Sequence, residues 1–205
     1  MIVRFLHGWG FDRTVWARVL PLLPDLDCRV DDRGYFAAPE TVDAGEVAVC
    51  HSFGTLRALA APRGIRALVA INGFDTFAAR AGFPGVPARL IDRMLARFDT
   101  APDAVVAEFR QRCGVADTPP LRDTATLRAD LVELREADRR AACALPVLAL
   151  HAADDPIVLP PMQAALFAAA PELETTRLAA GGHLLPLTAP EACAAAIRRA
   201  VERRA

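Results

Sequence analysis

Two short runs of the sequence are apolar at every position, and each is followed at once by a turn. The runs are Val47–Cys50, which leads into HSFG (51–54), and Ala67–Ile71, which leads into NG (72–73). A strand with one exposed face would carry a polar residue at every second position. Runs that are apolar throughout are typical of parallel strands covered on both faces. The chain is therefore predicted to contain a parallel sheet between layers of helices.

Further segments alternate between strand and helix patterns. The other predicted strands are Ile2–Leu6, Cys28–Asp31, Leu145–His151 and Thr175–Leu178. The predicted helices that accompany the strands are Thr14–Leu23, Thr55–Ala61, Pro161–Ala170 and Pro190–Arg203. Strands that alternate with helices define the α/β class, with a mostly parallel sheet and helices on both faces.

The segment 74–143 departs from this alternation. It carries helical patterns over Ala88–Phe98, Asp103–Cys113 and Thr124–Ala142, and no strand pattern. Because it lies between two predicted strands, it is interpreted as a helical lid inserted over one edge of the sheet. The predicted division is an α/β core formed by 1–73 and 144–205 and a lid insertion at 74–143.

Composition excludes several classes of protein. The formal net charge is -1, which offers no electrostatic basis for binding nucleic acid. No apolar run approaches the ~20 residues needed to cross a bilayer, and the first residues lack the pattern of a signal peptide. The five cysteines are scattered, without metal-ligand spacing. We expect a soluble cytoplasmic protein with reduced thiols, no metal, no cofactor and no membrane or nucleic-acid partner.

Three polar features follow predicted strands, at the edge of a parallel sheet where ligands bind. Ser52, the only serine in the chain, follows Val47–Cys50; the pair Asp154-Asp155 follows Leu145–His151; and His183 follows the last strand. A serine hydroxyl becomes nucleophilic when a histidine takes its proton and a carboxylate orients that histidine. The order Ser, Asp, His and the strand–turn–helix around Ser52 therefore favour a catalytic triad, with the choice between the two aspartates open.

The turn HGWG (7–10), after the first predicted strand, offers a second component of a catalytic site. Acyl transfer passes through a tetrahedral oxyanion that needs two preorganised N–H donors. The residue after the nucleophile, Phe53, supplies one, and Trp9 is expected to supply the other. Cys50 stands where the nucleophile turn usually has a glycine, and Gly54 is expected to let the following helix pack closely.

Each feature alone has a structural interpretation. Ser52 could be an ordinary turn residue, Asp154-Asp155 a helix cap, and His183 a surface histidine. The joint appearance of these residues, in the right order and after strands, favours the catalytic interpretation. The remaining histidines, at positions 7, 51 and 151, are assigned to structure.

The motifs HGWGFD, CHSFG, HAADDPIV and GGHLLPLTAPE resemble the α/β-hydrolase superfamily over nearly the whole chain. This resemblance implies the α/β-hydrolase fold and a triad of Ser52, Asp155 and His183. Asp155 is selected over Asp154 because the acid of such sequences stands three residues before the valine, here Val158. The resemblance also implies that Trp9 and Phe53 frame the oxyanion hole.

A finer resemblance is to the pimeloyl-acyl-carrier-protein methyl ester esterases of biotin synthesis. HGWG is similar to the BioH type, and the stretch 70–98 with FRQRCG (109–114) is similar to the BioG type. This resemblance implies a cofactor-free serine esterase that removes a methyl group from a pimeloyl chain held on acyl carrier protein. The alternatives are a general short-chain carboxylesterase or thioesterase without a carrier partner, and a non-catalytic scaffold that binds a ligand.

The lid contains a stripe of arginines at helical spacing. Arg89, Arg93 and Arg97 recur every four residues and share one helix face. Acyl carrier proteins are strongly acidic, so this stripe is a candidate docking surface. The alternative is an ordinary solvated helix face.

Overall fold

A six-stranded sheet forms the centre of the computed structural model, which describes residues 1–203. Its strand order is β2-β1-β3-β4-β5-β6, and every neighbouring pair is parallel. The strands are β1 Ile2–Leu6, β2 Asp27–Asp31, β3 Val47–His51, β4 Ala67–Ile71, β5 Val147–Ala152 and β6 Leu173–Leu178. The predicted parallel sheet is therefore confirmed.

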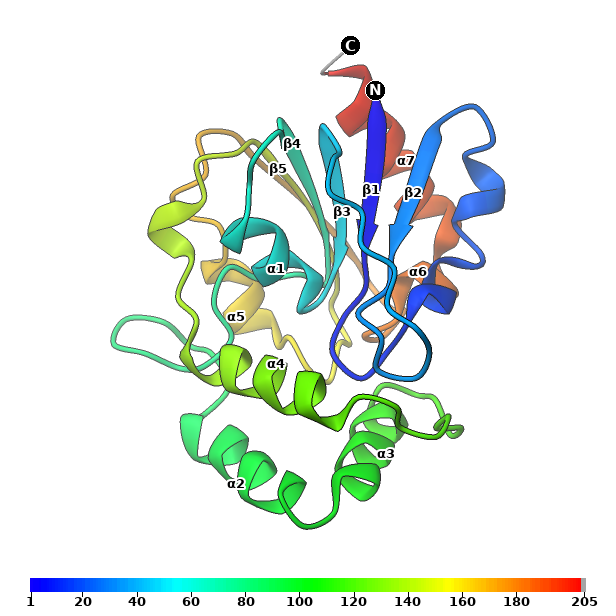
Figure 1. The fold of residues 1–205 in the computed structure, drawn as a ribbon. Coiled ribbons are helices and arrows are strands. Elements are labelled where there is room, and N and C mark those ends of the chain that lie inside the picture. The colour runs from blue at the N-terminus through cyan, green and yellow to red at the C-terminus, as the bar shows by residue number, and fades with distance from the viewer. Residues whose placement is uncertain (204–205) are drawn as a thin grey trace.

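Helices cover both faces of this sheet (Figure 1). One face carries α1 Gly54–Ala60 and α5 Pro160–Ala165. The other carries α6 Leu185–Thr188, α7 Pro190–Glu202 and the 3-10 turns η1 Arg13–Trp16 and η2 Leu20–Leu22. Every residue of β3 and β4 is buried between these layers, which explains why both strands are apolar throughout.

Three helices lie beyond the carboxyl ends of the strands, at the bottom of Figure 1. They are α2 Ala88–Phe98, α3 Pro102–Arg112 and α4 Thr124–Glu136. Within 74–143 the only other regular element is the 3-10 turn η3 Arg140–Ala142. The helical character of this segment agrees with expectation, while the division into core and lid remains a prediction. The predicted core extends to 205, and its last two residues lie outside the described part.

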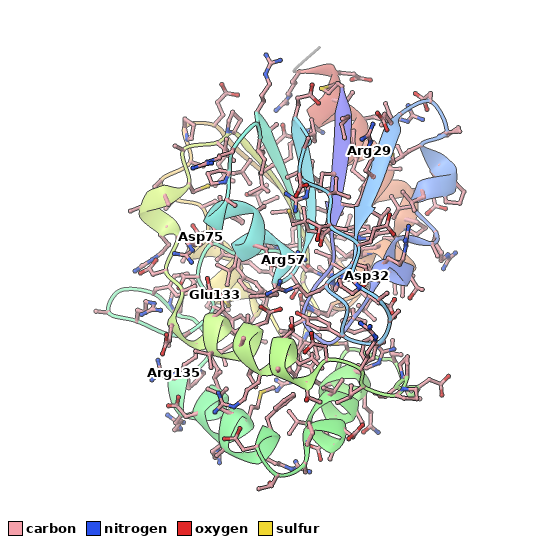
Figure 2. The ribbon with its side chains drawn as sticks, viewed as in Figure 1. Arg29, Asp32, Arg57, Asp75, Glu133 and Arg135 are labelled. Atoms are coloured by element: carbon pink, nitrogen blue, oxygen red, sulfur yellow. The ribbon has the colours of Figure 1, made fainter. Side chains whose placement is uncertain are left out.

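The lid is fastened to the core through Asp130, a buried carboxylate on α4. Arg33 donates two hydrogen bonds of 2.7 Å to it, and the hydroxyl of Tyr35 donates a third at 2.6 Å. Arg135, labelled on α4 in Figure 2, pairs with Asp92 of α2 at 2.6 Å, so the two helices also hold one another.

No helix among residues 1–203 is long and apolar enough to span a bilayer.

The predicted helix Thr14–Leu23 is wrong. The structure has two 3-10 turns there, the second of which contains Pro21. Proline lacks the N–H that a continuous α-helix needs in its interior, so the segment breaks into short turns.

Two other predicted helices are too long. Just beyond the observed end of each, a backbone N–H donates a hydrogen bond to Asp75. α4 ends at Glu136 rather than at residue 142, and the N–H of Arg139 donates to the Asp75 carbonyl at 2.8 Å. α5 ends at residue 165 rather than 170, because Phe167 adopts a φ of +57° and donates its N–H to the Asp75 carboxylate at 2.9 Å. Tertiary hydrogen bonds override the helical pattern at both places.

His151 on β5 offers a test of how the core tolerates a polar ring. The side chain is fully buried, and neither ring nitrogen has a hydrogen-bond partner among residues 1–203. Burial lowers its pKa from the ordinary 6.5 to about 4. Between these values the unfolded chain binds a proton that the folded chain does not, so stability is lost as pH falls from about 6.5 to 4.

We predict that His151→Leu is more stable than wild type and that its advantage grows on acidification. The apolar side chain removes two unpartnered polar atoms and the proton linkage together. Urea unfolding at pH 7 and pH 4.5 should show the gap widening by on the order of 2 kcal/mol. His151→Gln, polar but not titratable, is the control: it should lose the same part of the pH dependence as His151→Leu without gaining stability at pH 7. An equal gap at both pH values contradicts the prediction.

Candidate active site

Ser52 lies at the tip of a tight turn between β3 and α1. Its φ of +52° is a conformation that side chains other than glycine rarely adopt, and it stores on the order of 1–3 kcal/mol of strain. The turn is held by the Ser52 N–H, which donates to the Ile71 carbonyl at 3.1 Å. A Cβ on Gly54 would lie 2.3 Å from the Leu6 carbonyl oxygen, so only glycine lets α1 begin this close to β1.

The structure brings together the three side chains that the sequence nominated. The Oγ of Ser52 is 2.9 Å from Nε2 of His183, and Nδ1 of His183 is 2.9 Å from Oδ2 of Asp155. All three residues are buried, and they follow β3, β5 and β6 at the carboxyl edge of the sheet. These distances suit transfer of the serine proton to the imidazole.

Asp155 is held as an acceptor facing the ring of His183. Its Oδ1 accepts the N–H groups of Ile157 at 2.7 Å and Val158 at 3.1 Å. Burial raises the pKa of this carboxyl, but the charge of His183 and the hydrogen bonds outweigh burial, so the pKa is below its ordinary value. Asp155 is therefore ionised at neutral pH.

Asp154 has a different position from its neighbour. Its carboxylate is exposed and accepts the backbone N–H groups of Gly181 at 3.3 Å and Gly182 at 2.8 Å. These N–H groups lower its pKa. Asp154 thus holds the backbone that leads to His183, and the geometry leaves Asp155 as the partner of the imidazole ring.

The HGWG turn lies directly against the serine. A Cβ on Gly8 would be 3.0 Å from the Cβ of Ser52. Nε2 of His7 accepts the N–H of Arg33 at 2.9 Å, so Nδ1 carries the ring proton and donates to the Gly8 carbonyl at 2.9 Å. Burial lowers the pKa of His7, which keeps the ring neutral. Because the peptide is planar and trans, the Trp9 N–H points opposite to that carbonyl.

The two predicted oxyanion donors are both available. Within residues 1–203, neither the Trp9 N–H nor the Phe53 N–H donates to another protein group. Two such donors next to a serine match what a tetrahedral oxyanion requires. Their role in catalysis stays a prediction.

The lid holds the same turn from the opposite side. Nε1 of the buried Trp9 side chain donates to the Leu127 carbonyl on α4 at 2.8 Å. Its ring packs edge-on against Phe109 of α3, with centroids 5.0 Å apart. Arg110, also on α3, donates to the Gly10 carbonyl at 2.9 Å. The position of the turn therefore depends on α3 and α4.

A cavity of about 150 Å³ opens between Ser52 and the lid. Apart from Ser52 and Arg112, its lining residues are apolar, among them Phe74, Ile91 and Leu131. A cavity of this volume holds a benzene-sized group in other proteins, so this one suits a small apolar part of a ligand beside the serine.

A surface groove of about 320 Å³ adjoins this cavity. The two share the walls formed by Leu90, Met94, Phe109 and Arg112. The groove adds two members of the predicted stripe, Arg93 and Arg97.

All three predicted partner-binding arginines are exposed on α2, as the spacing indicated. Arg93 and Arg97 line the groove, whereas Arg89 does not. Arg97 is paired with Glu108 of α3 at 2.5 Å, so part of its charge is already compensated. Their role in binding a partner stays a prediction.

Sequence reasoning missed two residues behind His183. Asn72, the only asparagine in the chain, donates its side-chain amide to the His183 carbonyl at 2.9 Å. His51, assigned only to structure, donates Nε2 to the same carbonyl at 2.9 Å, and burial lowers its pKa to about 3. Asn72 directly follows a predicted strand at the edge where site residues gather, and that position was the available signal.

Cys50 does not disturb the turn. It is fully buried in β3 between Leu6 and Ala70 of the neighbouring strands, and burial raises its pKa to about 12. A thiol protonated at neutral pH does not compete with Ser52 as a nucleophile. No cluster of three or more His, Cys, Asp or Glu side chains within 1–203 is arranged to hold a metal ion.

No model of a known protein family matches the sequence, and no curated protein is detectably similar to it. Solved structures do match. An esterase from Exiguobacterium antarcticum is similar with a TM-score of 0.79 at 15% identity, over 98% of this chain and 92% of that one. A thermophilic esterase from Thermogutta terrifontis is similar with a TM-score of 0.73 at 18% identity, over 99% of this chain and 90% of that one.

An enol-lactonase from Burkholderia xenovorans LB400 is also similar, with a TM-score of 0.68 at 16% identity, over 98% of this chain and 91% of that one. Identities this low establish the architecture alone. Together with the parallel sheet and its flanking helices, they show that the chain has the α/β-hydrolase fold.

The two neighbouring aspartates give a direct test of the site. We predict that Asp155→Asn abolishes rapid labelling of Ser52 by a fluorophosphonate probe, because loss of the acid lowers turnover about 10⁴-fold in other triads. Asp154→Asn should label within about tenfold of wild type, since an amide oxygen still accepts a backbone N–H. The measurement is the second-order labelling rate at pH 7.5. Greater loss in Asp154→Asn would reverse the assignment.

Proposed function

We propose that the protein is a serine hydrolase that cleaves carboxylic esters. The observation that carries this proposal is the continuous hydrogen-bonded chain from Ser52 through His183 to Asp155, set beside two backbone N–H groups without a protein acceptor among the described residues. The esterases among the structural neighbours are consistent with it.

The geometry supports two half-reactions. Ser52 Oγ attacks the ester carbonyl while Nε2 of His183 takes its proton, and the N–H groups of Trp9 and Phe53 stabilise the oxyanion. The tetrahedral species collapses, the proton passes to the leaving alkoxide, and an alcohol departs. Water, deprotonated by His183, then attacks the acyl-serine, and the acid is released as Ser52 regains its proton. Asp155 orients the imidazole and stabilises its charge in both halves.

Replacement of Ser52 tests its role as the nucleophile. Ser52→Ala should fold normally, because the change removes one hydroxyl, and should lose p-nitrophenyl acetate hydrolysis by at least about 10³-fold. Since Ser52 is the only serine in the chain, the variant should also lose fluorophosphonate labelling completely. Ester turnover that persists at the wild-type rate would contradict the mechanism. A wild-type chain that neither turns over esters nor labels would favour a non-catalytic scaffold.

The finer proposal is that the substrate is the methyl ester of a pimeloyl chain on acyl carrier protein. Two features support it. The small cavity beside Ser52 suits an apolar segment next to a methyl ester. The neighbouring groove is lined by Arg93 and Arg97, whose charge complements an acidic carrier. Methanol and the carrier-bound free acid would be the products.

Charge reversal on the groove tests the carrier. The double variant Arg93→Glu/Arg97→Glu should lower kcat/KM for pimeloyl-acyl-carrier-protein methyl ester by about 10-fold or more, and far less for dimethyl pimelate, because only the former brings an acidic partner. Methanol release is the measurement. Arg63→Glu/Arg66→Glu, an exposed pair before β4, has the same change in charge and is the control.

The outcomes of this comparison separate the remaining candidates. Equal effects of the two double variants would remove the docking role of α2. Equal turnover of free and carrier-bound esters would leave a general short-chain carboxylesterase, for which the small apolar cavity is the supporting observation. Faster hydrolysis of a thioester than of the matching oxygen ester would make it a thioesterase.

A further inference from the structure

The loop that carries His183 is held from three strands at once. His51 at the end of β3 donates Nε2 to the His183 carbonyl. Asn72, just after β4, donates to the carbonyls of Gly182 and His183. Asp154, after β5, accepts the N–H of Gly182. The backbone of the predicted general base is thus attached to the strands that bear the nucleophile and the acid.

Asn72 has the central place among these groups. Its side chain is fully buried, with Nδ2 2.9 Å from both the Gly182 and His183 carbonyls, and Oδ1 accepting the Ala152 N–H at 3.0 Å. Its backbone N–H donates to the Leu150 carbonyl at 2.8 Å. The opposite orientation of the amide would set N–H against N–H and oxygen against two carbonyls, so only one orientation satisfies all partners.

The two ends of this amide contact the two halves of the base–acid pair. Ala152 is the last residue of β5, three residues before Asp155. The carbonyls on the other end belong to His183 and the residue before it. The Asn72 side chain therefore links the strand that leads to Asp155 with the backbone of His183. It fixes a spacing between the acid and the base that neither Asp155 nor His183 fixes by itself.

We propose that Asn72 is a positioning residue that sets the alignment of His183 with Asp155 and Ser52. This inference rests on the proposed hydrolase function and adds to it a residue that touches neither substrate nor reacting atoms. Misalignment of a catalytic group by about 1 Å costs about 100-fold in other enzymes. Loss of the amide should consequently lower the rate of chemistry more than substrate binding.

A second property of Asn72 must be separated from this role. Its φ is +43°, a conformation that asparagine and glycine tolerate better than other residues. Asn72→Ala would therefore combine backbone strain with loss of the amide. Asn72→Gly removes the amide while permitting the backbone, and Asn72→Asp retains an acceptor for the Ala152 N–H but has no N–H to donate to the two carbonyls.

The experiment measures p-nitrophenyl acetate hydrolysis by wild type, Asn72→Gly and Asn72→Asp, with kcat expressed per site titrated by a fluorophosphonate. We expect kcat to fall about 10- to 100-fold in both variants while KM stays within about threefold of wild type. We also expect the far-downfield proton resonance of the His183 Nδ1–H, present in wild type, to weaken or vanish. Thermal unfolding is recorded for each protein.

Thr76→Val is the matched control. Thr76 is fully buried, and its hydroxyl donates to the Ala137 carbonyl at 3.1 Å, away from the His183 loop. It should lose stability without the change in kcat or in the downfield resonance. The proposal is overturned if the Asn72 variants match this control in kcat, if KM alone changes, or if both variants fail to fold, which would assign the amide to stability.

If the hydrolase proposal itself fails, the same experiment gives a different set of results. In that case wild type itself neither hydrolyses the ester nor labels with the probe. The proton resonance then still tests the alignment: its loss in both folded Asn72 variants, with retention in Thr76→Val, supports the positioning role, and its retention in them overturns that role.

Discussion

The close approach of α1 to β1 at Gly54 is the contact on which the rest of the site depends. With no side chain at this position, the helix begins against the Leu6 carbonyl, where a Cβ would be 2.3 Å from the oxygen. Two residues before Gly54, Ser52 has a positive φ at the edge of the sheet. Gly8, two residues after the end of β1, lies against Ser52. The nucleophile and the turn expected to bind the oxyanion are placed by the same contact.

Burial gives the four histidines different chemistry. It lowers the pKa of His7, lowers that of His51 to about 3 and lowers that of His151 to about 4, so these three rings are neutral at pH 7. Within residues 1–203, His183 alone among them has a carboxylate within hydrogen-bond distance of its ring. A transferred proton is therefore stabilised at one imidazole, the one that contacts Ser52.

Much of this arrangement was predictable, because strand ends and chain order leave a pattern in the sequence. Apolar runs located the central strands, and the bounds of α2 agree with the prediction to the residue. The nominated Ser52 and His183 meet because parallel strands bring their carboxyl ends together. Helix lengths failed where Asp75 captured backbone groups from two distant segments, since such a hydrogen bond has no counterpart in local periodicity.

The same limit explains why the specific roles of the supporting residues were not predicted: Asn72 was not singled out, His7 was assigned only to structure, and Asp154 was considered only as the alternative acid or a helix cap. Asn72, His7 and Asp154 form hydrogen bonds with backbone carbonyls and N–H groups. Every amino acid has a backbone carbonyl, and all but proline have an N–H, so the partner in such a bond leaves no mark in the sequence. Sequence patterns identify pairs of side chains with matched chemistry, as in the triad. They do not identify a side chain whose partner is a peptide group.

The lid and the oxyanion turn form one mechanical unit. Moving α4 away from the sheet breaks the bond from Trp9 to the Leu127 carbonyl, and moving α3 breaks the bond from Arg110 to Gly10. Either displacement would remove a hydrogen bond that holds the turn next to Ser52. The cavity beside Ser52 and the groove on α2 and α3 are lined in part by the same residues of these helices. The helices that line the cavity beside Ser52 thus also hold the turn that carries Trp9, one of the two predicted oxyanion donors.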